Sequence, residues 1–163
     1  MQAFILGLGR PVDLLKVDVL NVMGVALIAA ALLWGLADDD RRRVWIAVGV
    51  TAALAFAAPF VRSAAWIELL PAPVQWYLRP TPGHTNFTLL PWAGFVTAGL
   101  GVGVAVAGAR RAADERRVQL VLAALAIGGT AFAVWASVQP SIYAPGRSTF
   151  WGPSPAFFAI RLG

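Results

Sequence analysis

The stretch VDVLNVMGVALIAAALLWGLADDDRRR, residues 17–43, decides the fold class. From Val17 to Ala37 it is apolar, apart from Asp18 at its start and Asn21 one helical turn later. About 20 such residues span the hydrocarbon core of a bilayer, so we predict a first transmembrane helix at about residues 17–37. The six consecutive charges that follow, Asp38 to Arg43, cannot lie in hydrocarbon and predict a tight aqueous turn.

Three further apolar runs follow along the chain. We predict spanning helices at about residues 44–61, 89–109 and 118–138, with Pro59 kinking or ending the first of these three. Residues 63–88 contain four prolines and several aromatic residues, a pattern typical of segments at the level of the lipid headgroups.

A last apolar run begins at Pro155 and predicts the start of a fifth helix. The sequence therefore predicts an all-α fold: a polytopic transmembrane helix bundle with about four spanning helices plus the start of a fifth. Residues 1–163 form a single transmembrane domain in this interpretation.

Composition supports lipid as the solvent. The chain is 59% hydrophobic and only 13% charged, with a mean hydropathy of +0.71, whereas soluble domains are about a quarter charged. There is no cysteine, which excludes a disulfide, a thiol nucleophile and a thiolate metal site, and one histidine with scattered carboxylates predicts no metal site of another kind.

The net charge of +5 is interpreted as information about topology. The arginines lie in short clusters between apolar runs, so no nucleic-acid partner is predicted; the predicted partner is the lipid bilayer. The turns at 38–43 and 110–117 contain seven arginines, and basic residues concentrate in short cytoplasmic loops. These Arg-rich turns are therefore predicted to be cytoplasmic, and the longer loops to face outward.

Asp18 and Asn21 are the first candidates for a functional site. They lie three residues apart, so both can point in one direction at the start of the first helix. A carboxylate and an amide inside a bundle can bind a polar substrate, because polar groups at membrane depth are costly and usually have partners. The alternative is structural: Asp18 caps the helix and Asn21 bonds a neighbouring helix.

His84 is the candidate catalytic residue. It lies in the outward loop just before the third predicted span, beside Thr85 and Asn86. With an ordinary pKa near 6.5, a histidine there can act as a general base on a sugar hydroxyl. The alternative is a solvated or hydrogen-bonded structural side chain.

Gly99 and Gly103 lie four residues apart in the third predicted span. This spacing lets another helix backbone approach closely and favours a homo-oligomer that forms through this helix. The run Gly99-Leu100-Gly101-Val102-Gly103 is not a phosphate loop, since no strand precedes it and no Lys-Ser/Thr follows it.

Three strings carry a resemblance to a known family. KVDVLNVMGVAL (16–27), FTLLPWAGFV (87–96) with Gly99 after it, and FFAIRLG (157–163) occur in this order. They resemble helix segments of bacterial multi-pass membrane proteins similar to heparan-alpha-glucosaminide N-acetyltransferase. The resemblance is to the middle and C-terminal part of that family's domain.

The resemblance implies a transmembrane acyltransferase in a bacterial inner membrane. It implies that an acetyl group passes from cytoplasmic acetyl-CoA, an acyl-CoA donor, to a sugar amine or hydroxyl across the membrane. The family's catalytic histidine lies in a part of the domain to which nothing in this chain corresponds, so its role is not transferred to His84, and the chain is expected to be a fragment. The positions that match the family, expected to line or shape the substrate path, are Asp18, Asn21, Pro91, Trp92 and Arg161.

Two other functions remain open from the sequence. One is a small transporter or channel subunit that completes its pore by oligomerising through the glycine-rich helix. The other is a membrane scaffold without catalytic activity. An acyltransferase binds acyl-CoA, a transporter shows substrate flux without that binding, and a scaffold shows neither.

Overall fold

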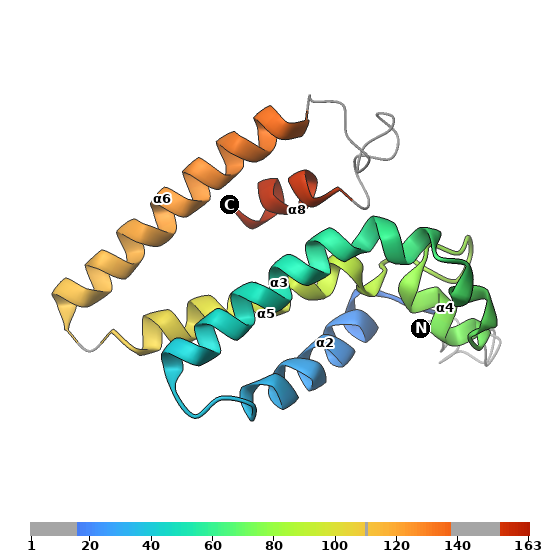
Figure 1. Cartoon of the computed structure of the whole chain (residues 1–163), viewed down its shortest axis with the longest axis horizontal. Coiled ribbons are helices and arrows are strands. Elements are labelled where there is room, and N and C mark those ends of the chain that lie inside the picture. The colour runs from blue at the N-terminus through green and yellow to red at the C-terminus, as the bar shows by residue number, and fades with distance from the viewer. Residues whose placement is uncertain (1–15, 110, 138–153) are drawn as a thin grey trace, which may run out of the picture.

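The computed structural model describes residues 16–109, 111–137 and 154–163 (Figure 1). Its regular elements in chain order are α2 (Val19–Trp34), α3 (Asp40–Ser63), the 3-10 helix η2 (Ala65–Leu69), α4 (Ala72–Leu78), α5 (Leu89–Ala107), α6 (Ala112–Ser137) and α8 (Pro155–Leu162). Every regular element within these ranges is a helix, which confirms the all-α prediction. The expected fifth apolar helix is α8.

The antiparallel pair α3 and α5 forms the centre of the bundle (Figure 1). Helix α2 packs against α5 on one side. On the other side lies α8, which packs mainly against α6 and makes smaller contacts with α3 and α5. The order across the bundle is therefore α2, then α3 with α5, then α8 with α6.

Three helices, α3, α5 and α6, are long and apolar enough to cross a membrane. Helix α2 is apolar too, but its 16 residues extend for only about 24 Å, less than the roughly 30 Å of a bilayer core. It is shorter than the predicted span because Asp18 caps its first turn and Gly35 forms its C-cap. In the part of the chain that the structure describes, three long spans and one short apolar helix give the architecture of an integral membrane protein.

The charged runs correct two predicted boundaries. Helix α3 begins at Asp40, inside the run predicted to be a turn, because Oδ1 of Asp39 accepts a hydrogen bond from the backbone N of Arg42 at 2.8 Å. Asp40 then forms an ion pair with Arg43 at 3.0 Å. Helix α6 likewise begins before Val118, and its first turn contains Asp114 and Glu115, which favour a helix N-terminus.

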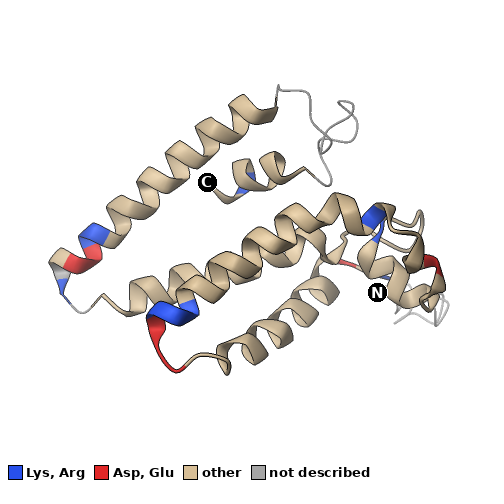
Figure 2. Ribbon diagram, in the orientation of Figure 1, with Lys and Arg blue, Asp and Glu red and all other residues tan. Residues whose placement is uncertain are grey.

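Figure 2 shows where these charges lie in the bundle. The charged first turns of α3 and α6 are at the same end, here called the arginine end. The opposite end, called the proline end, is where α3 ends and where α2 and α5 begin, with η2 and α4 beside them. The prediction that both Arg-rich turns share one side is met by this arrangement, and assignment of that side to the cytoplasm stays a prediction.

The prolines affect the helices differently in residues 63–88 and at Pro59. Residues 63–88 form no spanning helix but only η2 and α4 with turns between them, as predicted. Pro59, by contrast, does not end α3, which continues to Ser63. The hydroxyl of Ser63 donates to the carbonyl oxygens of Pro59 and Phe60 at 3.0 and 3.2 Å and supports this last turn.

Small residues allow α3 and α5 to approach closely. A Cβ added at Gly101 would lie 3.1 Å from the Cβ of the buried Ala47, and the hydroxyls of Thr51 and Thr97 share a hydrogen bond of 2.8 Å. Gly99 and Gly103, which the spacing had suggested for helix contact, have nothing within 4 Å of an added Cβ. Contact between these two glycines and a second copy stays a prediction.

Candidate functional site

The start of α2 is tied to the loop before α5 by backbone hydrogen bonds. The N of Val17 donates to the carbonyl oxygen of His84 at 2.8 Å, and the N of Asn86 donates to the carbonyl oxygen of Val17 at 2.9 Å. Val17 is fully buried in this short parallel pairing. The pairing brings most of the sequence-predicted site residues to the proline end: Asp18, Asn21, His84, Pro91 and Trp92.

Asp18 and Asn21 both bond to the backbone near their own helix start. Oδ1 of Asp18 accepts from the backbone N of Val19 at 2.7 Å, so the capping interpretation of Asp18 is confirmed. Nδ2 of Asn21 donates to the carbonyl oxygen of Lys16 at 2.7 Å, which is a contact within its own segment instead of one with a neighbouring helix. The Asp18 side chain is exposed, so its second oxygen remains accessible to a polar ligand.

His84 is held by a stacked indole. Its ring lies 4.3 Å from that of Trp76 between centroids, with 25° between the planes, and its Nδ1 is 3.3 Å from the carbonyl oxygen of Pro82. Thr85 fixes the same turn, since its Oγ1 donates to the carbonyl oxygen of Trp76 at 2.9 Å. Stacking sets the orientation of the imidazole, and Nε2 is the ring atom left to exchange a proton with a substrate.

Pro91 and Trp92 shape the start of α5. The Leu90–Pro91 peptide bond is cis, and Leu90 has non-helical φ and ψ of −102° and 127°. Trp92 begins a row of aromatic contacts that leads from the loop into the bundle. The centroid distances are 5.1 Å from Phe87 to Trp92, 5.6 Å from Trp92 to Phe95 and 4.4 Å from Phe95 to Phe158.

Arg62 is a further residue of the candidate site, which no motif in the sequence singles out. Its Nη2 donates to Oγ1 of Thr88 at 2.6 Å and to the carbonyl oxygen of Leu90 at 3.0 Å, and Thr88 itself donates to Leu90 at 2.8 Å. This contact fastens the end of α3 to the irregular start of α5. The available signal was an arginine directly after a long apolar run, because charged groups at the edge of a span usually have partners.

Arg161 lies apart from the polar residues at the proline end. It is exposed on the last turn of α8, and its guanidinium carbon lies 5.0 Å from the centroid of the Phe157 ring. Since α8 packs mainly against α6, the structure does not bring Arg161 together with Asp18 and Asn21, which belong to the opposite side of the bundle.

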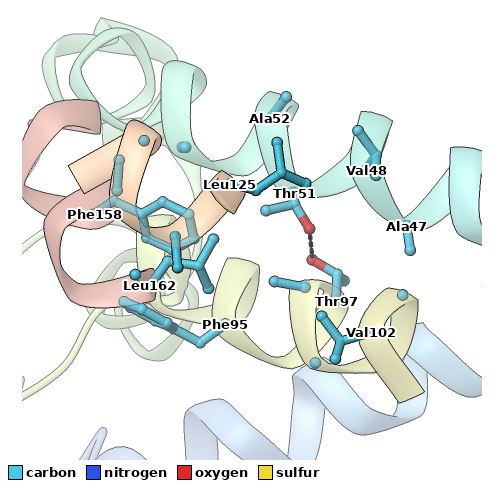
Figure 3. A pocket seen from close by; sticks show the side chains of 18 of the residues that line it. Ala47, Val48, Thr51, Ala52, Phe95, Thr97, Val102, Leu125, Phe158 and Leu162 are labelled. Atoms are coloured by element: carbon cyan, nitrogen blue, oxygen red, sulfur yellow. Dashed lines mark hydrogen bonds between the residues drawn. The ribbon is translucent and has the colours of Figure 1, made fainter. Parts of the chain in front are cut away.

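An apolar groove of about 640 Å³ lies between the α3–α5 pair and the α6–α8 pair (Figure 3). Its volume is within the range of about 300–1,000 Å³ that is usual for small-molecule sites. The two threonines in its wall on α3 and α5, Thr51 and Thr97, bond to one another, while Phe95, Phe158 and Leu162 bound its end near α8. The groove therefore suits an apolar ligand.

Within the described ranges, no group of three or more His, Cys, Asp or Glu side chains could hold a metal ion. The candidate site is thus a polar surface at the proline end, with an apolar groove beside it that starts at the aromatic row. A comparison of the chain with protein-family models, curated proteins and solved structures finds no match.

Proposed function

We propose that this chain is a membrane-bound acyltransferase-like protein, or a part of one. It moves an acyl group, typically acetyl, from a cytoplasmic acyl-CoA to a sugar amine or hydroxyl on the other side of the membrane. The observation that supports the proposal is the pairing of Val17, in the first family-like string, with His84 and Asn86, which directly precede the second string, at one end of the bundle.

The acceptor binds at the proline end in this proposal. The accessible oxygen of Asp18 accepts a hydrogen bond from it, and Pro91 and Trp92 shape the path. The acceptor nitrogen or oxygen forms a bond to the acyl carbonyl carbon as the carbon–sulfur bond breaks. Coenzyme A leaves as the thiolate, and the acceptor proton passes to a base, for which Nε2 of His84 is the available group at this end.

The donor first binds at the arginine end, which supplies charge complementary to the phosphates of coenzyme A, and its thioester then has to reach the acceptor through the path between the helices. Arg41 and Arg42 are exposed on the first turn of α3, whereas Arg43 pairs with Asp40 and lies over the ring of Trp34 at 4.4 Å. Arginine is well suited to bind phosphate because its guanidinium donates two parallel hydrogen bonds. The first two arginines are therefore the expected phosphate ligands.

Acetyl-CoA binding to the full chain in nanodiscs tests this function. We expect binding that free coenzyme A competes away, and an affinity about tenfold lower in the double variant Arg41→Gln/Arg42→Gln, since a charge-assisted hydrogen bond contributes about 1.5–3 kcal/mol. Arg79→Gln is the matched control, because Arg79 lies at the other end and already bonds Glu68 and Gln75. If the wild-type chain shows no saturable binding, the proposal is wrong and a transporter or scaffold function takes its place.

A further inference from the structure

The groove and Arg62 together point to a lipid site that is independent of acyl transfer. The groove lies along the membrane-spanning parts of α3, α5 and α6, and its lining is almost entirely apolar. An open apolar cavity at this depth does not stay empty in a bilayer, because hydrocarbon chains surround it. The groove can therefore hold the acyl chain of a lipid.

Arg62 continues the groove-lining face of α3 toward the proline end. Val48 and Ala55 line the groove, and Arg62 follows at the same seven-residue spacing, two helical turns beyond Ala55. One more residue, Ser63, completes the helix. Arg62 is thus on the groove-lining face of α3 at the end of this span, and its guanidinium lies against the start of α5, where it bonds Thr88 and Leu90.

The charge of Arg62 is not neutralised by the part of the chain that the structure describes. The two ion pairs there are Arg43–Asp40 and Arg79–Glu68, and the hydrogen bonds that Arg62 makes there are to the neutral oxygens of Thr88 and Leu90. Its Nε is buried and has no hydrogen-bond partner among the described residues. A phosphate near this guanidinium would stabilise its unpaired charge without having to reach the buried Nε.

We propose that this chain binds an anionic phospholipid, with one acyl chain in the groove and the headgroup phosphate at Arg62. An anionic phospholipid supplies both parts that the site lacks: an apolar chain for the groove and a negative charge at the level of the headgroups. A second copy of the chain would fill the groove with a helix but would leave the charge of Arg62 to be matched separately.

The test is lipid retention by the purified chain after reconstitution in nanodiscs of phosphatidylcholine and phosphatidylglycerol. Native mass spectrometry of the extracted protein should show phosphatidylglycerol retained in preference to phosphatidylcholine. Arg62→Gln should lower that preference about fivefold, since one arginine near a membrane surface contributes about 1 kcal/mol to anionic lipid binding. Arg79→Gln is the control and should keep the wild-type preference for phosphatidylglycerol.

A second variant tests the groove without touching Arg62. Gly99 lines the groove and has nothing within 4 Å of an added Cβ, so Gly99→Trp should fill the cavity and reduce retention of both lipids. Gly103→Trp is the matched control, because Gly103 is equally open but does not line the groove. Unchanged lipid preference in Arg62→Gln, unchanged retention in Gly99→Trp, or a lipid-free dimer from the wild type would each overturn the proposal.

Discussion

Gly101→Leu is expected to lower the free energy of unfolding by about 2 kcal/mol, because overpacking a filled contact costs about 1–3 kcal/mol. Even a Cβ at this position would lie 3.1 Å from the Cβ of Ala47, which is itself buried in α3. A leucine adds three more carbons beyond this Cβ, and the close contact with Ala47 requires α3 and α5 to shift apart. The separation also stretches the 2.8 Å hydrogen bond between Thr51 and Thr97.

Gly103→Leu is the control for this prediction. It makes the same substitution half a turn further along α5, where nothing lies within 4 Å of the added Cβ, so it should change stability by much less. The measurement is reversible unfolding of both variants in mixed detergent micelles, followed by circular dichroism. Equal losses in the two variants would mean that α3 and α5 do not pack through Gly101.

Asp18→Ala is expected to reduce acyl transfer at least tenfold. The reason is the loss of the carboxylate that accepts a hydrogen bond from the acceptor, an interaction of about 1.5–3 kcal/mol for a charged partner. The same variant also removes the cap of α2, which costs about 1 kcal/mol of stability. The measurement is transfer of a labelled acetyl group from acetyl-CoA to glucosamine by the chain in nanodiscs.

Asp18→Asn separates the two roles of this side chain. Asparagine caps a helix as well as aspartate does, so this variant should keep the stability of the wild type. It removes the negative charge, so acyl transfer should fall as it does in the alanine variant. Wild-type activity in Asp18→Asn would leave Asp18 with a capping role alone.

The apolar runs were sufficient to predict the helices. A segment of about 20 apolar residues in lipid must satisfy its own backbone hydrogen bonds, and a helix does so. The helix boundaries were less predictable where a helix begins inside a run of charged residues, as α3 and α6 do. Asp39 is a good N-cap and Asp40 pairs with Arg43 one turn later, so four residues of a charged run are more stable as helix than as a turn. Hydropathy alone does not register such local hydrogen bonds.

The candidate site was predictable in its residues but not in its contacts. Asp18, His84 and Trp92 come from distant parts of the sequence, and their shared end follows from the direction of the helices. The stacking of His84 on Trp76 depends on a turn held by Thr81 and Thr85, which no spacing rule describes. Arg62 was missed for a similar reason, since its partners lie 26 and 28 residues further along the chain.

The glycine pattern shows the same limit. Spacing selected Gly99 and Gly103, but the structure uses Gly94 and Gly101 for close approach. Gly94 lies against the ring of Phe158, and a Cβ there would come within 2.8 Å of that ring. The neighbouring side chain decides which glycine is needed: a phenyl ring lies against Gly94 and a methyl group lies against Gly101. These neighbours belong to other helices, so the sequence of α5 alone does not identify them.

Helices α3 and α5 are expected to cross the membrane and to place the arginine end and the proline end on opposite sides. Labelling of single cysteines tests this arrangement directly, because the chain has no cysteine of its own. Asp38→Cys and Glu115→Cys report on the arginine end, and Glu68→Cys on the proline end; all three side chains are exposed. In sealed right-side-out vesicles, an impermeant maleimide should label only the Glu68 variant, and in inverted vesicles only the other two. Labelling of all three variants from one side would contradict the account.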